Sequence, residues 1–197
     1  RQLLYQLDDD LNELYDQTLY YIKDTSKGLG YYRYQAIRFL PKEVKDKIYN
    51  KRAELISEQL AMIMKTLLVK RIDSSFHAFK KTLHRFLMAN TAMKKMLDDD
   101  RVFIAPKLNV NEFVLNEETA ELEEILKQVE DPEHIQAFSR DDFEQEFIDG
   151  IEHDQKILEN LNNAWGKIDY DPKYEEFVYR LKDGLFSTEI NDNHKLV

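Results

Sequence analysis

The stretch that decides the fold class runs from Ser139 to Ile168 and reads SRDDFEQEFIDGIEHDQKILENLNNAWGKI. Its large apolar residues recur at the spacing of one face of an α-helix: Phe143, Phe147, Ile151, Leu158, Leu161, Trp165 and Ile168. The acidic Asp142 follows the hydroxyl side chain of Ser139 by three residues, a near match to the capping box that opens helices. We therefore predict a long helix that begins at Ser139, with Asp154 interrupting its apolar seam.

Helical periodicity also fills the first hundred residues. The first predicted helix has its apolar positions at Leu4, Leu7, Leu11, Leu14, Thr18 and Ile22. We expect Gly28 and Gly30 to end it, because glycine accepts the left-handed conformation of many helix ends. After a short aromatic piece over residues 31–40, Pro41 opens a long helix, whose apolar positions are Val44, Ile48, Leu55, Leu60, Ile63 and Leu67. Asp73 or Ser74 caps the next helix, and its buried face is formed by Phe76, Phe79, Leu83, Phe86, Met93 and Leu97.

The second half of the chain contains weaker signals around the long helix. The triplet at residues 98–100 is all aspartate and closes the preceding helix, and Val102–Ile104 is the best short strand candidate. A weaker acidic helix is predicted over Glu117–Glu130. Asp171 and Pro172 start a last helix, buried through Tyr174, Phe177, Val178, Leu181 and Leu185. The predicted fold class is all-α, an antiparallel helical bundle with long helices and at most one or two very short strands.

Composition narrows the class of protein further. The 197 residues contain no cysteine, which removes disulfides and thiolate zinc sites and fits a reducing compartment. No apolar run is long enough for a membrane span and no signal peptide opens the chain, so we expect a cytoplasmic protein. The chain starts at Arg1 without methionine and stops where an apolar run begins, so we expect a segment of a longer protein.

The net charge of −10 conceals an uneven distribution along the chain. Residues 42–97 contain 13 Lys and Arg against 5 Asp and Glu, whereas residues 107–197 contain 9 against 24. We expect a helical segment with a basic face over residues 1–100 and an acidic helical segment over residues 101–197, which can pack as one domain. Such charge separation can steer partners, although the acidic half can equally be a solvated surface.

A search for chemistry finds no complete active site and predicts no catalytic residue, metal ligand or cofactor-binding residue. Gly166 and Lys167 form the one Gly-Lys pair, and Ile168 stands where a phosphate-binding loop needs Ser or Thr. There is no serine elbow of the Gly-x-Ser-x-Gly type and no cysteine nucleophile. Three pairs of potential metal ligands are interpreted as structural or surface residues: Asp131 with His134 in the run Asp131-Pro132-Glu133-His134, Asp149 with His153, and His77 with His84.

Basic residues crowd the centre of the chain and suggest contact with nucleic acid. The predicted contact residues are Lys70, Arg71, Lys80, Lys81 and Arg85, with Lys65, His84, Lys94 and Lys95 nearby. Such a surface can neutralise backbone phosphates through counterion release, independent of sequence. The alternative is that these side chains are ordinary polar faces of amphipathic helices, placed near helix C-termini by the dipole.

The run Lys70-Arg71-Ile72-Asp73-Ser74-Ser75 resembles a Lys-Arg-Leu-Glu-Ser-Ser run of bacterial helicase-like ATPases in the Swi/Snf family. In that family the run follows the first RecA-like motor lobe and leads into the helices between the lobes. The resemblance implies that this chain is the inter-lobe helical region of an ATP-dependent DNA helicase or translocase. The stretch His194–Val197 resembles the opening strand of the second lobe.

The resemblance also implies what the chain lacks. ATP and magnesium would be held by the flanking RecA-like lobes of the parent protein, so no cofactor is expected in this segment. Asp73, Ser74 and Ser75 would cap and orient the helix that carries the basic face towards the DNA backbone. Two other hypotheses are a helical protein-interaction module without a nucleic-acid role and a freestanding enzyme with an unrecognised carboxylate site.

Overall fold

A computed structural model describes residues 5–24, 26–48, 53–104 and 136–181 of the chain, which are mostly helical. In chain order the elements are α1 (Asp9–Lys23), η1 (Tyr32–Phe39), α2 (Lys42–Ile48), α3 (Ala53–Ser74), α4 (Phe76–Asp98), β1 (Val102–Ile104), β2 (Gln136–Phe138), η3 (Arg140–Asp142), α7 (Gln145–Gly166) and α8 (Pro172–Arg180). The predicted weak helix over 117–130 lies outside the described residues. No described helix is long and apolar enough to cross a membrane.

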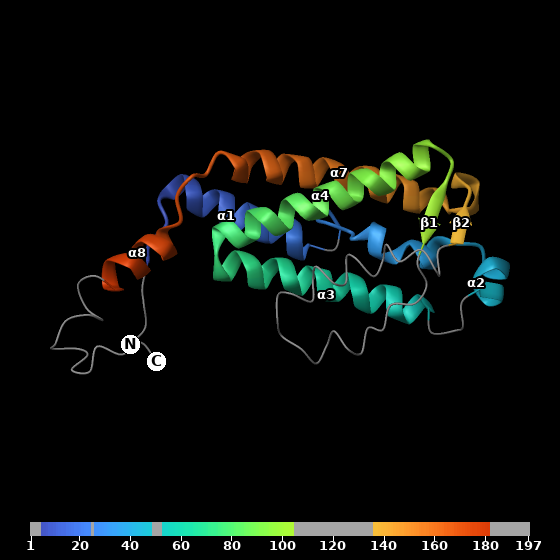
Figure 1. Ribbon diagram of the computed structural model, residues 1–197, viewed down its shortest axis with the longest axis horizontal. Helices are drawn as coiled ribbons and strands as arrows, with labels where there is room; N and C mark the ends of the chain where they lie inside the picture. Colours follow the sequence, from blue (N-terminus) through green and yellow to red (C-terminus); the bar gives the residue numbers. More distant parts are fainter. Residues whose placement is uncertain (1–4, 25, 49–52, 105–135, 182–197) are drawn as a thin grey trace.

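The helices form an elongated antiparallel bundle, as the sequence predicts. The chain runs back and forth along the long axis, with α3, α4 and α7 alternating in direction and α8 projecting from one end (Figure 1). At the other end β1 pairs antiparallel with β2, with Val102 opposite Phe138. The strand predicted at Val102–Ile104 is therefore confirmed.

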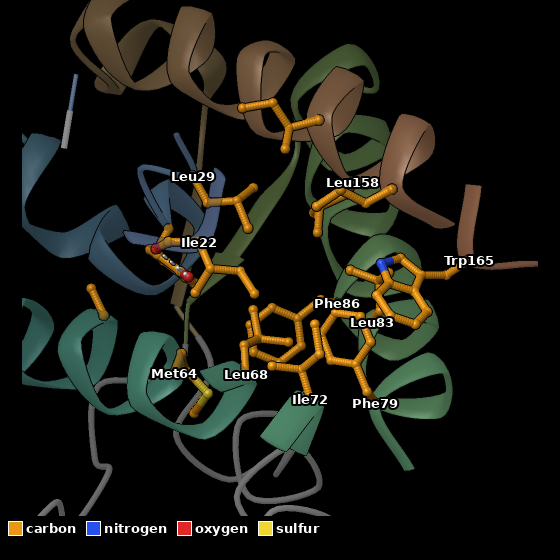
Figure 2. Close-up of a cluster of buried hydrophobic side chains, with 14 of the residues drawn as sticks. Ile22, Leu29, Met64, Leu68, Ile72, Phe79, Leu83, Phe86, Leu158 and Trp165 are labelled. Carbon is orange, nitrogen blue, oxygen red and sulfur yellow. Dashed lines mark hydrogen bonds between the residues drawn. The ribbon is translucent and has the colours of Figure 1, made fainter. Parts of the chain in front are cut away.

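Two clusters of buried side chains fill the bundle, and both combine residues from before and after residue 100. The larger cluster lies between α1, α3, α4 and the second half of α7 (Figure 2). The smaller cluster joins η1, the end of α4, the two strands and the start of α7. Every position predicted for the buried face of α4 is buried, because this helix alternates apolar and polar residues cleanly along its length.

The buried face of α3 differs from the predicted one. Leu55 is 54% exposed, whereas Met64, Leu68 and Ile72 are fully buried. Apolar residues surround most of this helix, and Met62 is also exposed, so spacing alone could not identify the side that meets the core. The predicted single helix after Pro41 is described as two segments, α2 and α3, and residues 49–52 between them lie outside the described residues.

The predicted capping box at Ser139 is present, but the helix that it opens is only the short η3. The long helix α7 begins six residues later, at Gln145, with extended backbone at Phe143 and Glu144 between the two. The N–H of Glu144 donates to the carbonyl oxygen of Phe39 at 3.0 Å, and this bond to η1 diverts the chain from a continuous helix. The predicted start at Ser139 was therefore wrong by one short turn.

The end of α1 is built differently from the prediction. The helix stops at Lys23, and the carboxylate of Asp24 accepts bonds from the N–H groups of Ser26 and Lys27. No described glycine has a positive φ; the left-handed residue in this connection is Tyr31, at φ 56°. Gly28 is needed for space instead, since a Cβ there would lie 2.4 Å from the carbonyl oxygen of Tyr21.

Asp154, which interrupts the apolar seam of α7, fastens this connection to the bundle. Its carboxylate is 2% exposed and accepts bonds from the N–H groups of Gly30, at 2.7 Å, and Tyr32, at 3.0 Å. These two bonds flank Tyr31 and hold it in its left-handed conformation. Burial raises the pKa of Asp154 to about 6, although the two N–H groups oppose that rise.

We expect the stability of the protein to increase as the pH falls from 7.5 to 5, because of Asp154. Its folded pKa of about 6 lies above its unfolded value, so the folded state binds the proton more tightly in this interval. The free energy of unfolding should rise by about 1 kcal/mol more in the wild type than in Asp154→Asn, which carries no titrating group. Urea titrations of both proteins at the two pH values measure this difference, and equal pH dependence would contradict it.

The last helix, α8, starts as predicted at Asp171 and Pro172, but the predicted burial of its apolar face is wrong. Tyr174 is 66% exposed and Phe177 is 46% exposed, and no residue of α8 is buried. The helix projects beyond the bundle, where it contacts the rest of the described chain mainly through its first turn (Figure 1). Leu185 lies outside the described residues.

Candidate functional site

The run that resembles the Swi/Snf motif occupies the sharp junction between α3 and α4. Residues 70–74 form the last turn of α3, Ser75 is the single residue between the helices, and Phe76 begins α4. Ser75 is the N-cap of α4: its backbone is extended, and its hydroxyl accepts a bond from the N–H of Ala78 at 3.4 Å. Asp73 and Ser74 belong to α3, so the cap lies at the last of the three proposed residues.

Asp171 links this junction to α8 through a single carboxylate. One oxygen accepts bonds from the N–H groups of Lys173, at 3.1 Å, and Tyr174, at 3.4 Å, and so caps α8. The other oxygen accepts the N–H of Phe76 at 2.9 Å, which is the first N–H of α4, and lies 3.5 Å from the hydroxyl of Ser75. One side chain thus satisfies free donors of two helices that are 95 residues apart in sequence.

Lys173 completes the same junction from the opposite direction. Its ammonium group donates to the carbonyl oxygen of Ile72 at 3.1 Å and also to that of Asp73. These carbonyls are among the last of α3, where a helix presents free acceptors and partial negative charge. The ammonium also lies 5.5 Å from the ring centre of Phe76. The first turn of α8 therefore contacts both the end of α3 and the start of α4.

Aromatic residues from α1 and α7 pack behind the junction. The ring of Phe76 lies 5.0 Å from that of Trp165, which is fully buried and donates through its indole N–H to the hydroxyl of Thr18 at 2.8 Å. Tyr15 of α1 donates its hydroxyl proton to Asp73 at 2.5 Å. Burial and this bond to the carboxylate raise the pKa of Tyr15. We call the residues that meet here the α3–α4–α8 junction: Tyr15, Asp73, Ser75, Phe76, Trp165, Asp171 and Lys173.

The structure separates the predicted basic residues into two groups. Lys80 is half-buried, and its ammonium donates to the carbonyl oxygen of Ile168 at 2.5 Å, just beyond the end of α7. Lys65 makes the equivalent bond to the carbonyl oxygen of Lys23 at the end of α1. These two lysines donate hydrogen bonds to carbonyl oxygens at the C-terminal ends of helices. Lys81 and Arg85 of α4 and Lys70 of α3 are exposed, and Arg71 is half-buried.

Replacing Lys80 by alanine should destabilise the fold, whereas the same change at the adjacent Lys81 should not. Lys80 bonds a carbonyl at the negative end of α7, and losing this contact should cost about 1 kcal/mol. Lys81 is exposed on the same helix, so its loss should stay within about 0.5 kcal/mol. Urea unfolding of the two variants gives the comparison, and equal losses would show that the Ile168 contact contributes nothing.

The candidate metal ligands do not come together in the part of the chain that the structure describes. No group of three or more His, Asp and Glu side chains there could hold a metal ion. His77 and His84 are exposed on α4, His153 lies 3.1 Å from the carbonyl oxygen of Gly28, and Asp149 accepts a bond from Gln145. The run Asp131-Pro132-Glu133-His134 lies outside the described residues. Gly166 is the last residue of α7, so its neighbourhood is helical rather than a phosphate-binding loop.

An open groove of about 320 Å³ between η1 and α3 provides a test of the enzyme hypothesis. Asp24 and Glu146 are its acidic lining residues. The Asp24 carboxylate is occupied by the N–H groups of Ser26 and Lys27, and these bonds lower its pKa. Asp154, the carboxyl group whose pKa burial raises, does not line the groove. Asp24 and Glu146 are thus the two carboxylates of this groove, and Asp24 already accepts two backbone hydrogen bonds.

Comparison with known proteins finds no family model, no curated protein and no solved structure that matches this chain. The α3–α4–α8 junction is the part of the candidate site that the structure reveals and the sequence pattern did not predict. Sequence analysis assigned Asp171 to the start of α8 but missed its bond to α4, and it missed the roles of Lys173 and Tyr15. The sequence offered only two signals for these residues, their polar or charged side chains and their positions near helix boundaries. It could not show their partners, because those partners are distant in sequence.

Proposed function

We propose that this chain is the helical region between the two motor lobes of a cytoplasmic, ATP-dependent DNA helicase or translocase of the Swi/Snf type. Its role is mechanical: it connects the lobes and sets their relative orientation. The observation that carries the proposal is the position of the motif-like run. It lies where α3, α4 and α8 are joined by the two side chains Asp171 and Lys173.

The junction is suited to transmit orientation. A change in the direction of α8 must move Asp171, which is bonded to the start of α4, and Lys173, which is bonded to the end of α3. Behind them Trp165 packs between α4 and α1, so the junction rests on a close-packed core. The resemblance places the second lobe after α8, and this junction would then lie on the path between the lobes. ATP and magnesium would be bound and used by the lobes alone.

One observation favours the second candidate, a protein-interaction module. Three aromatic side chains of α8 are exposed: Tyr174, Phe177 and Tyr179. Aromatic residues are enriched where proteins bind one another, so α8 could be a docking helix in a protein without a motor. Under that hypothesis the molecular mass should increase with concentration or with an added partner, and duplex DNA should not bind.

The experiment that tests the proposed function uses the complete reading frame that encodes this chain. We expect it to encode a Gly-Lys-Thr or Gly-Lys-Ser loop before Arg1, and the purified product to hydrolyse ATP faster with duplex DNA. Asp171→Ala in that protein should reduce DNA translocation more than basal ATP hydrolysis, because the lobes stay intact while their connection loosens. The matched control is Asp169→Ala, an exposed acid two residues away. A reading frame without a phosphate-binding loop would contradict the motor.

A further inference from the structure

The side of α3 that points away from the bundle is uncharged and partly apolar over most of its length. Leu55 is 54% exposed and Met62 is 69% exposed. Ile63, beside them on the helix, is only half-buried. We define the outer face of α3 by a row of four exposed, uncharged residues: Leu55, Gln59, Met62 and Thr66. A helix with apolar residues on all sides is normally covered on all sides, so this face predicts a further partner.

The spacing of the outer face of α3 indicates what kind of partner fits. Its four residues follow one another at intervals of four, three and four, which is the seam spacing of helices that pack side by side in coiled coils. The face is about 17 Å long, at 1.5 Å per residue. The described elements that pack most against α3 are η1, α4 and α1, which adjoin its other sides. The occupant that fits is therefore another helix with a seam of the same period.

The chain itself contains such a seam in residues 105–135, between β1 and β2, which lie outside the described residues. The sequence predicts an acidic helix over Glu117–Glu130. Four of its residues follow at intervals of three, four and three: Thr119, Leu122, Leu126 and Val129. This seam would be about 15 Å long as a helix. The two seams thus agree in period and in length.

The ends of this segment are fixed near the start of α3. Ile104 pairs with Gln136 across the two strands, so the segment leaves and returns at one point. The strands lie at the end of the bundle where α3 begins (Figure 1). Residues 131–135 span at most about 18 Å, whereas residues 105–116 can span about 40 Å. The C-terminal end of the predicted helix must therefore stay near the start of α3, which favours the antiparallel direction.

Charge favours the same pairing. The predicted helix over Glu117–Glu130 contains six Glu and one Lys, whereas α3 contains no Asp or Glu from Gln59 to Ile72. Glu58, at the edge of the outer face, is paired with Arg38 at 3.7 Å. The acidic helix would thus meet no opposing row of acids along this part of α3. Because both helices belong to one chain, the tether raises their effective concentration and a modest apolar contact suffices.

We propose that residues 117–130 form a helix that docks on the outer face of α3 in the antiparallel direction. Leu122 then lies opposite Met62, and Val129 lies opposite Leu55. The partner of this surface is a segment of the same chain. It supports the exposed side of α3, the helix that leads into the α3–α4–α8 junction. The docking is independent of the proposed motor, because both surfaces belong to this chain.

Cysteine crosslinking in the 197-residue chain tests this docking, since the chain has no cysteine of its own. The pair Met62→Cys with Leu122→Cys should form an intramolecular disulfide under mild oxidation, because facing seam residues bring their Cβ atoms close enough for that bond. The matched control combines Leu122→Cys with Met88→Cys, which replaces an exposed methionine of α4. The first pair should oxidise at least about tenfold faster than the control, measured by gel mobility and intact mass.

A charge placed in the seam of the segment gives a second comparison. Leu126→Asp should slow oxidation of the pair at positions 62 and 122 by about tenfold, because docking would bury an unpaired carboxylate against α3. Ala120→Asp introduces the same charge on the opposite side of the predicted helix and should leave the rate unchanged. Circular dichroism verifies that the bundle of every variant is folded.

Three results would overturn the proposal. The first is an equal oxidation rate for the Met62 pair and the Met88 control. The second is a disulfide that links two chains, since a second copy would then occupy the outer face of α3. The third is an equal effect of Leu126→Asp and Ala120→Asp, because the apolar seam would not be the contact. The reading-frame test of the proposed function can succeed or fail separately from all three.

Discussion

Replacing Trp165 by alanine should cost about 4 kcal/mol of the free energy of unfolding, because truncation of a fully buried aromatic leaves a large cavity. The indole ring packs against Phe76 and Phe79 with centroid separations of 5.0 and 5.1 Å. Its N–H donates to the hydroxyl of Thr18, which itself donates to the carbonyl oxygen of Leu14. Loss of the ring therefore removes packing from α4 and a hydrogen bond from α1 together. Equilibrium unfolding in urea measures the loss.

Trp165→Phe separates the two contributions. Phenylalanine keeps most of the ring packing but leaves the Thr18 hydroxyl without its donor, and it should cost about 1–2 kcal/mol. Tyr174→Ala is the control, because it removes an aromatic ring that is exposed on α8. Its free energy of unfolding should remain within about 0.5 kcal/mol of the wild-type value. A loss below about 1 kcal/mol for Trp165→Ala would show that α7 is not packed as described.

Among substitutions at the surface of the α3–α4–α8 junction, Asp171→Ala should lower the free energy of unfolding the most, by about 3 kcal/mol. A helix N-cap contributes about 1 kcal/mol, and this carboxylate caps α8 while it also satisfies the first N–H of α4. Asp171→Asn keeps one acceptor oxygen and should lose about half as much. A further effect should appear in hydrogen exchange, as faster exchange at the amides of Phe76 and Tyr174.

The control for Asp171→Ala is Ser75→Ala, which removes the cap of α4 alone and should cost about 1 kcal/mol. If Asp171→Ala costs no more than Ser75→Ala, the carboxylate does not join two helices. A double variant would add a second check. Because both side chains serve the start of α4, the sum of the single losses should exceed the loss in the double variant.

The helices that could be predicted from the sequence are those with one clear apolar side. α4 shows this best, because its apolar residues all face one way and its polar residues separate them. α3 shows the limit. It has apolar residues on most sides, so the side that is buried was decided by η1, α1 and α4, which pack against it, and not by its own pattern. The same reason explains the wrong prediction for α8, none of whose residues is buried by the described part of the chain.

Long-range polar contacts are the other part that sequence patterns do not contain. Asp154 looks like a defect in an apolar seam, yet its partners are N–H groups of Gly30 and Tyr32 in a connection more than 120 residues earlier. Asp171 looks like an ordinary helix cap, and its second partner is the amide of Phe76. Local rules predict the first bond of each cap but not the second. Contact of nucleic acid with the five basic residues Lys70, Arg71, Lys80, Lys81 and Arg85 stays a prediction.

The central claim is that the junction holds α8 in a fixed orientation relative to the α3–α4 hairpin, and electron spin resonance tests it most directly. The chain has no cysteine, so Glu175→Cys on α8 and His84→Cys on α4 place two spin labels at unique, exposed sites. Pulsed dipolar measurement should give a single narrow distance distribution, which Asp171→Ala broadens. A broad distribution before that substitution, or an unchanged narrow one after it, would contradict the claim.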